Sequence, residues 1–382
     1  TDWLASIDGL TPLNPLSNPF PTGALIPPTS PAELLAVGQA ITINPRYNKN
    51  DSYTQHWSAG IQREFGAGWL IEAAYTGNTG IRLPMALDFN QVPTEHMALG
   101  QDLLRRVPNP FLGLVRTGAL SAPTVTLNQL LRPHPQYLGM DSNLNHTAFS
   151  QYHAVQIKGE RRFSRGMMIL ATYTAGKMID NGSGRVVTFT PFRPPAQNQY
   201  DLRSEKSISQ QDISQRLNIS HTIDLPFGKG RLRGGWSAAG NATLHTGFPL
   251  ALTSAGNTGL FTTVLRPNST GQSAELSGPA QDRLRRYFNT AAFTLPAAFA
   301  FGNTSRTLPD TRGPGRRNYN LALTKRTAIN ERFALLFRAE AFNLTNTPFF
   351  LPPGINLGAA NFGVIESATN ERQMQFTLRL TF

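Results

Sequence analysis

The stretch that decides the fold is Glu371–Phe382, which reads ERQMQFTLRLTF. From Met374 to Phe382 the even-numbered residues are apolar, and the odd-numbered residues between them are polar. Successive side chains of a β-strand point to opposite faces, so this period of two predicts a strand with one apolar and one polar face. The chain therefore ends on a strand whose two faces suit two different surroundings.

The composition agrees with a chain of strands, turns and polar loops. Hydrophobic residues make up 40% of the 382 residues and charged residues only 15%, while Gly (33) and Pro (28) are plentiful. Soluble proteins usually carry about 25% charged residues. No apolar run reaches the roughly 18 residues of a membrane-spanning helix. The net charge of +12 could indicate a nucleic-acid partner, but the basic residues are scattered, so we expect none.

Alternation with period two recurs in nine segments, which form four hairpins and the final strand. The first 50 residues are instead rich in Pro, Asn, Leu and Ser and are predicted to be loop, because proline fits neither a helix interior nor a strand ladder. Residues 51–382 hold the sheet. The predicted strands span residues 55–65, 69–76, 151–163, 167–178, 217–225, 236–244, 319–323, 333–339 and 374–382.

The connections between these strands sort by length. Each hairpin closes through a short turn, whereas long polar segments at about 77–149, 179–215 and 346–370 separate the hairpins from one another and from the last strand. A soluble sandwich would show turns every 8–12 residues or so without this sorting. Outer-membrane barrels have short periplasmic turns and long extracellular loops. We therefore predict an all-β fold: an antiparallel transmembrane β-barrel, present here in part.

The number of strands suggests a larger parent barrel. Bacterial barrels close with an even number of strands, and nine is odd. We expect further strands upstream of this sequence, in a probable barrel of about 22 strands, the size class of plugged outer-membrane transporters.

Six segments carry a family resemblance: residues 57–83, 150–181, 225–236, 312–326, 332–350 and the closing LRLTF at 378–382. In this collinear order they resemble the C-terminal barrel half of Oar-like TonB-dependent receptors. The resemblance implies a 22-stranded barrel with a plug and an N-terminal regulatory-like domain, both absent from this sequence. It also implies energised uptake of a nutrient or peptide ligand, with the TonB complex as a partner through that missing N-terminal region.

If the apolar rows face lipid, the opposite rows line the lumen. Gln62, Glu64 and Glu72 lie in such rows of the first hairpin. Alternatively, charges on neighbouring strands pair across the ladder, a contribution of roughly 0.2 to 1 kcal/mol each. Substrate capture is expected in the long loops, at residues 107–113 and 131–139 and in the region from Arg283 to Phe293. The lumen-facing candidates are Lys158, Glu160, Arg162, Arg338, Glu340 and Arg379.

Aromatic residues mark the short-turn end of the strands. Trp69, Trp236 and Phe382 would lie at one height there, as expected at a membrane interface. In the last strand, Phe376, Leu378, Leu380 and Phe382 should meet lipid. Phe382 is similar to the terminal aromatic by which the outer-membrane assembly machinery recognises barrels, so this machinery is a further expected partner.

The sequence offers no pattern for catalysis or for a cofactor. Cysteine is absent, and no GxSxG motif occurs. The Gly-rich strings lack the context of a phosphate-binding loop, and no histidine spacing predicts a metal site. The seven histidines occur singly, at His56, His96, His134, His146, His153, His221 and His245.

Two functions from different classes remain open. The first is the barrel part of a TonB-dependent transporter in the outer membrane of a Gram-negative bacterium. The second is a surface-exposed barrel that binds a partner, as an adhesin does, without transport. An upstream plug domain would distinguish them.

Overall fold

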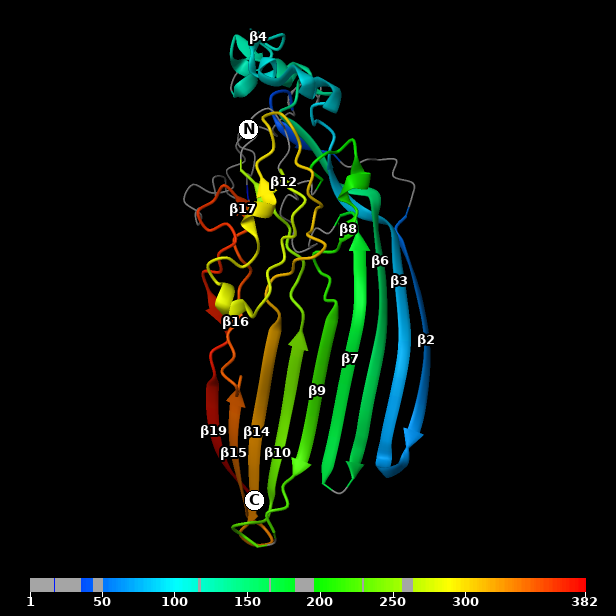
Figure 1. Ribbon diagram of the computed structural model, residues 1–382, viewed down its shortest axis with the longest axis vertical. Coiled ribbons are helices and arrows are strands. Elements are labelled where there is room, and N and C mark those ends of the chain that lie inside the picture. Colours follow the sequence, from blue (N-terminus) through cyan, green and yellow to red (C-terminus); the bar gives the residue numbers. More distant parts are fainter. Residues whose placement is uncertain are drawn as a thin grey trace.

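The computed structural model describes residues 36–43, 51–115, 118–164, 166–182, 196–228, 230–255 and 264–382, together with Ser17. Most of the Pro-rich segment 1–50 lies outside these residues. Nine long strands form the body of one antiparallel sheet (Figure 1). They are β2 (Tyr53–Phe65), β3 (Trp69–Asp88), β6 (Gly139–Ser164), β7 (Met167–Asp180), β9 (Gln215–Asp224), β10 (Trp236–His245), β14 (Arg316–Ala328), β15 (Ala334–Phe342) and β19 (Gln373–Thr381).

The order of the long strands in the sheet follows their order in the chain. Each pairs with the next, from β2 at one edge to β19 at the other, and all these pairs are antiparallel. Figure 1 shows the four hairpin turns at one end of the strands and the long connections at the other. All nine predicted strands are present, and the predicted sorting of connections by length is confirmed.

The segment at 77–149 differs from the expectation of a single long loop. β3 continues to Asp88 and β6 begins at Gly139, so the pair of strands extends well beyond the first predicted hairpin. Register shifts interrupt this extension between Gly80 and Leu87, and Arg82 has a φ of 57°. Bulges of this kind break the alternation of side chains, which is why the period of two does not reveal these strands.

Short elements complete the fold around the long strands. β1 (Ala40–Thr42) pairs in parallel with β6, inside the segment predicted to be loop, because a pairing 99 residues distant leaves no local sequence signal. The remaining short strands are β4 (Arg106–Pro108), β5 (Thr124–Thr126), β8 (Ser207–Ile208), β11 (Thr253–Ser254), β12 (Asn268–Ser269), β13 (Phe293–Thr294), β16 (Phe349–Phe350), β17 (Asn356–Leu357) and β18 (Ala368–Thr369). The helical segments are α2 (Leu127–Leu130) and the 3-10 turns η1 (Gly66–Gly68), η2 (Thr94–Leu104), η3 (Ala119–Ser121), η4 (Leu202–Glu205), η5 (Ala280–Arg283) and η6 (Thr290–Ala292).

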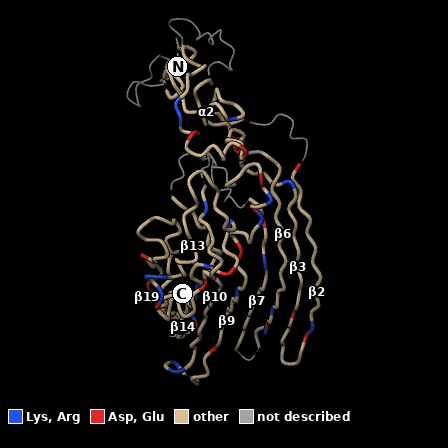
Figure 2. Tube along the Cα trace, turned by 45° about the horizontal axis from the view of Figure 1, so that its top comes forward, with Lys and Arg blue, Asp and Glu red and all other residues tan. Residues whose placement is uncertain are grey.

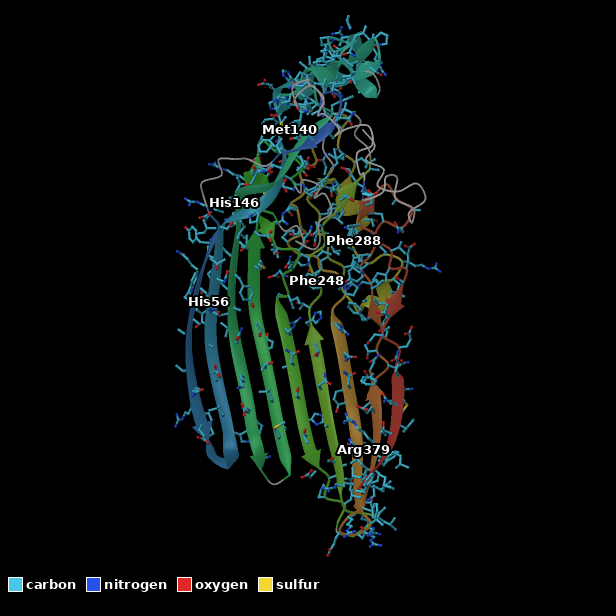
Figure 3. All side chains as sticks on the ribbon, turned by 180° about the vertical axis from the view of Figure 1, so that it is seen from behind. His56, Met140, His146, Phe248, Phe288 and Arg379 are labelled. Atoms are coloured by element: carbon cyan, nitrogen blue, oxygen red, sulfur yellow. The ribbon has the colours of Figure 1, made fainter. Side chains whose placement is uncertain are left out.

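The largest apolar core lies in the long connections and not against the sheet. Phe288 is fully buried there and meets Phe293 and Phe362 edge to face, with ring centroids 6.1 and 5.1 Å apart. Figure 3 shows Phe288 in this upper region, far from Arg379 near the opposite end of the strands. Within the described ranges, no helix is long and apolar enough to cross a membrane. The other buried members of this core are Leu250, Leu252, Ala274, Tyr287, Ala292, Leu308 and Ile365.

Candidate functional site

The strand register divides the side chains of the sheet into two continuous faces. Ile61 lies opposite Ala73, Ala73 opposite Ile157, and Ile157 opposite Tyr173, so their side chains share one face. The same face continues across the remaining strands to Phe337 and Leu378. We call this apolar surface the outward face and the opposite surface the inward face.

The inward face carries the residues expected to line a lumen. Lys158 lies opposite Glu72, Arg338 opposite Thr377, and Arg379 opposite Leu336. Glu160 and Glu340 follow Lys158 and Arg338 on the same face, because they are two residues further along the same strands. Arg162 belongs to β6, but its side chain lies outside the described residues.

Two ion pairs on the inward face each lie along a single strand. Lys158 and Glu160 on β6 are 3.0 Å apart, and Arg338 and Glu340 on β15 are 2.7 Å apart. The alternative of pairing across the ladder is therefore wrong for these residues. A pair along one strand puts both partners on the same face, because side chains two residues apart point the same way. Both pairs are partly exposed, so each contributes about 1 kcal/mol at most.

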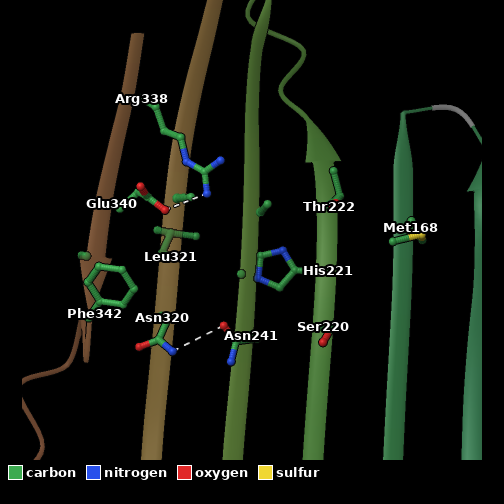
Figure 4. A pocket seen from close by; sticks show the side chains of 14 residues that line it. Met168, Ser220, His221, Thr222, Asn241, Asn320, Leu321, Arg338, Glu340 and Phe342 are labelled. Carbon is green, nitrogen blue, oxygen red and sulfur yellow. Dashed lines mark hydrogen bonds and ion pairs between the residues drawn. The ribbon is translucent and has the colours of Figure 1, made fainter. Parts of the chain in front are cut away.

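A shallow cavity of about 310 Å³ joins the second of these pairs to the middle of the sheet. Figure 4 shows the guanidinium of Arg338 directed at the Glu340 carboxylate, and the Asn320 amide directed at Asn241. The Asn320 Nδ2 donates to Asn241 Oδ1 over 3.4 Å. Short polar side chains here leave room above the sheet, so this stretch of the inward face can hold water or a polar solute.

The predicted interface aromatics lie where strands leave short turns. Trp69 begins β3 and Trp236 begins β10, and both belong to the outward face. Lys325 Nζ lies 5.1 Å from the Trp236 ring centroid. Phe382 follows β19 and is 94% exposed, with its ring 6.4 Å from that of Phe333.

All nine residues of the edge strand β19 are exposed, so exposure does not distinguish its two faces. The register does: Phe376 and Leu378 lie opposite Ala339 and Phe337 on the outward face. An exposed row of apolar side chains is unfavourable in water but expected on a face that contacts lipid.

A second aromatic group lies on the outward face nearer the long connections, and the sequence analysis missed it. The Trp57 side chain covers Gly77, where an added Cβ would come within 2.3 Å of the indole ring. His153 lies beside this indole, and its Nδ1 is 2.6 Å from the Tyr75 hydroxyl. Of these residues, His153 was read only as an isolated strand histidine. Trp57, Gly77 and His153 lie side by side on three neighbouring strands. This arrangement can be recognised only when the strand register is known.

The long connections are held together by three ion pairs whose carboxylates are buried. Asp180 pairs with Arg306, Glu205 with Arg266 at 2.9 Å, and Asp212 with Arg312 at 2.5 Å. The carboxylates come from the end of β7 and the connection to β9, whereas the arginines come from the connection between β10 and β14. We call the described residues of these two connections, 181–182, 196–214, 246–255 and 264–315, the cap. Pairs separated by 61 to 126 residues leave no pattern in the sequence, so none was predicted.

Gln197 joins the cap to a third connection. Its Nε2 donates to the Gly302 carbonyl over 2.8 Å, and its Oε1 accepts from the Arg266 backbone N–H over 2.7 Å. Its own carbonyl accepts from Gln91 Nε2 over 2.9 Å, which ties in the connection between β3 and β6. Gln197 is only 3% exposed, so these hydrogen bonds are shielded from water. The cap therefore has one defined arrangement over its described part.

A cavity of about 700 Å³ lies where the cap meets the upper ends of β9, β10 and β14. Its lining includes Arg283 and Tyr287, from the loop region expected to capture substrate. At the strand ends it includes Arg216 and Arg316 of the inward face and Tyr173 and Arg317 of the outward face. Burial raises the pKa of the Tyr287 phenol, whose hydroxyl donates to the Arg312 carbonyl over 2.9 Å. The other two loop stretches proposed for capture, at 107–113 and 131–139, do not line this cavity.

Comparison with known protein families shows the family to which the chain belongs. A family model described as an outer membrane beta barrel domain matches residues 2–375. The chain belongs to the outer membrane β-barrel family. Its sheet is therefore a wall in the bacterial outer membrane, with its short turns on the periplasmic side and its long connections outside.

Comparison with curated proteins gives no match. Among solved structures, similar folds include the outer membrane transporter YddB from Escherichia coli, with 9% identity, a TM-score of 0.43, and coverage of 90% of this chain and 34% of that one. The pyoverdine outer membrane receptor FpvA from Pseudomonas aeruginosa PAO1 has 9% identity and a TM-score of 0.38, with coverage of 87% of this chain and 30% of that one. The siderophore receptor PiuA from Acinetobacter baumannii has 10% identity and a TM-score of 0.32, with coverage of 85% of this chain and 35% of that one. The chain thus spans about a third of the length of these proteins.

Among the residues that the structure describes, no group of three or more His, Asp or Glu side chains is placed to hold a metal ion.

Proposed function

We propose that this chain forms part of the barrel of an Oar-like TonB-dependent receptor, which takes up a nutrient or peptide ligand through a plugged lumen. The observation that carries the proposal is the two-faced sheet, apolar outward and charged inward, with a hydrogen-bonded cap at its extracellular end. A barrel wall with only a structural role would need the apolar outward face but not the charged inward face. The charged pairs at Lys158 and Arg338 keep the inward face hydrated, as a passage for polar solutes requires.

Among the described residues, β2 and β19 each have one edge without a paired strand, which supports the proposal that the barrel continues beyond this sheet. An unpaired edge exposes backbone N–H and C=O groups, which hydrocarbon cannot satisfy. We propose that additional strands pair with both edges in a barrel of about 22 strands. A plug and a TonB-contacting segment would come from an N-terminal region outside this sequence. Phe382 would contact the barrel assembly machinery.

The proposed ligand site is the cavity between the cap and the strand ends. Its mixture of aromatic and arginine side chains suits a ligand with both apolar and anionic groups. The proposal assigns the chain binding and passage, and no catalytic step.

A surface receptor without transport is the second candidate. The cap favours it in one respect, because its buried ion pairs and the Gln197 hydrogen bonds make a fixed platform, as a partner-binding surface needs. The two candidates differ in whether a ligand crosses the membrane and whether that step requires energy from TonB.

The test compares uptake with and without energy coupling. Cells expressing the full-length protein, with TonB present or deleted, would be incubated in a complex nutrient extract, and solutes lost from the medium would be measured by mass spectrometry. Transport predicts that at least one solute is depleted only when both the protein and TonB are present. Binding of a solute to the cells that is the same without TonB would contradict transport and support the surface receptor.

A further inference from the structure

The charges on the two faces of the sheet differ in sign as well as in number. Among the described side chains on the outward face of the nine long strands, below the bulges of β3, every charged one is basic. The described side chains of the inward face include six acids and six bases. The outward residues are Arg63, Arg161, Lys177, Arg317 and Lys325. The inward residues are Glu64, Glu72, Glu160, Asp180, Asp224 and Glu340, with Lys158, Arg216, Arg316, Arg326, Arg338 and Arg379.

Three of the outward residues, Arg63, Arg161 and Lys325, lie close to the periplasmic turns; we call them the lower basic belt. Figure 2 shows basic residues close to these lower ends of the strands. Two of the three lie against an aromatic ring: Arg63 is 5.4 Å from the centroid of Phe65, and Lys325 is 5.1 Å from that of Trp236. The third, Arg161, lies opposite Trp69 in the register.

None of the three belt residues has an acidic partner among the described residues. Lys325 Nζ donates to the carbonyls of Leu232 and Gly234, both over 2.8 Å, so its charge is solvated but not neutralised. Within the described part of the chain, Arg161 Nη1 contacts the Met167 sulfur at 3.7 Å, and its buried Nε has no hydrogen-bond partner. Uncompensated cations facing lipid are unfavourable unless they reach the headgroup level, where phosphates are available.

We propose that the lower basic belt binds the phosphate groups of anionic phospholipids in the periplasmic leaflet. Guanidinium and ammonium groups donate to phosphate oxygens, and guanidinium does so with two parallel bonds. The aromatic rings lie at the depth where the headgroups begin, and they hold the basic side chains over that depth. The absence of acids from the described outward rows removes competing partners. This proposal rests on the outer-membrane location and is independent of transport.

The test measures lipid selectivity by native mass spectrometry of the full-length protein released from detergent. The protein would be incubated with equal amounts of phosphatidylglycerol and phosphatidylethanolamine of identical acyl chains. The belt variant is R63Q/R161Q/K325Q. The control is K158Q/R338Q/R379Q, which removes three positive charges from the inward face of the same sheet. Heat-modifiable migration in gels reports whether each variant is folded. If the belt variant does not fold, the single variant R63Q is compared with the wild type instead.

We expect the wild-type protein to prefer phosphatidylglycerol to phosphatidylethanolamine by up to about a hundred-fold, because its three belt residues act together. A basic residue close to anionic headgroups contributes about a five-fold preference, so R63Q should lower the ratio about five-fold and the belt variant should bring it close to one. The control should keep the wild-type ratio. Equal retention of the two lipids by the wild type, or equal loss of selectivity in both triple variants, would overturn the proposal. A belt variant that instead loses lipid A, with its phosphatidylglycerol ratio unchanged, would place these residues in the opposite leaflet and also overturn it.

Discussion

Replacement of Leu378 by arginine tests which face of the last strand contacts lipid. Leu378 lies opposite Phe337 on the outward face and is 66% exposed. It is four residues from Phe382, which follows the strand at its periplasmic end. A rise of about 3.3 Å per residue along a strand tilted by about 40° places Leu378 roughly 10 Å above that end. The apolar band of a barrel is about 25 Å tall, so Leu378 is near its middle.

An arginine at the midplane of a barrel's lipid face costs about 2 to 4 kcal/mol. We therefore expect Leu378→Arg to lower the free energy of unfolding of the full-length protein by about 2 to 3 kcal/mol. The matched change is Arg379→Leu at the next position. Its side chain points inward, so we expect a change below about 1 kcal/mol. Together the two variants place opposite changes in charge on opposite faces of one strand.

The assay is urea-dependent folding into phosphatidylcholine vesicles, followed by the migration of unheated samples in gels. Leu378→Arg should shift the folding midpoint to lower urea, and Arg379→Leu should leave it close to that of the wild type. Equal shifts in both variants would refute the assignment of faces, and a larger shift for Arg379→Leu would reverse it.

Three predictions concern the cap. Gln197→Ala leaves the Gly302 carbonyl and the Arg266 backbone N–H buried without partners, which costs about 1 to 3 kcal/mol for each group. The variant should therefore show faster proteolytic cleavage of the cap with unchanged barrel folding. Unchanged cleavage would refute the role of Gln197. Arg306→Gln leaves the Asp180 carboxylate buried and unpaired, and should destabilise the cap by about 3 to 5 kcal/mol, measured by hydrogen exchange; protection equal to the wild type would contradict this. Because burial raises the pKa of Tyr287, the neutral phenol stabilises the cap below about pH 10, and this contribution is lost as the pH rises through the folded pKa. Hydrogen exchange of the cap should therefore accelerate at alkaline pH in the wild type and less in Tyr287→Phe, and identical profiles would exclude this residue as the cause.

The wall of the barrel could be predicted from the sequence because its physical requirement is local. A strand between lipid and a lumen must alternate at every second residue, and the nine strands do so in the printed sequence. Phe376 and Leu378 show the pattern without reference to any distant residue. The same argument fails where bulges interrupt the alternation, as between Gly80 and Leu87, and there the strands were missed.

The cap could not be predicted because its contacts join residues distant in the sequence. Nothing around Glu205 indicates that its partner is Arg266, and nothing around Gln197 indicates that it joins three connections. The register places the described lumen-facing candidates on one face of the sheet, and that this face lines a lumen stays a prediction. The partner of Lys158 is Glu160 on the same strand and not a neighbour across the ladder. Pairing between particular side chains depends on rotamers, which the alternation does not determine.

We predict that adjacent residues of β19 face lipid and a water-filled lumen in turn. The chain contains no cysteine, so single cysteines can be introduced into it at Gln375, Phe376, Thr377 and Leu378 and labelled in outer-membrane vesicles with a water-soluble maleimide. We predict labelling at positions 375 and 377, and protection at 376 and 378 that is lost when the membrane is dissolved and the protein unfolded. Labelling of all four positions, or of the even positions alone, would contradict the account.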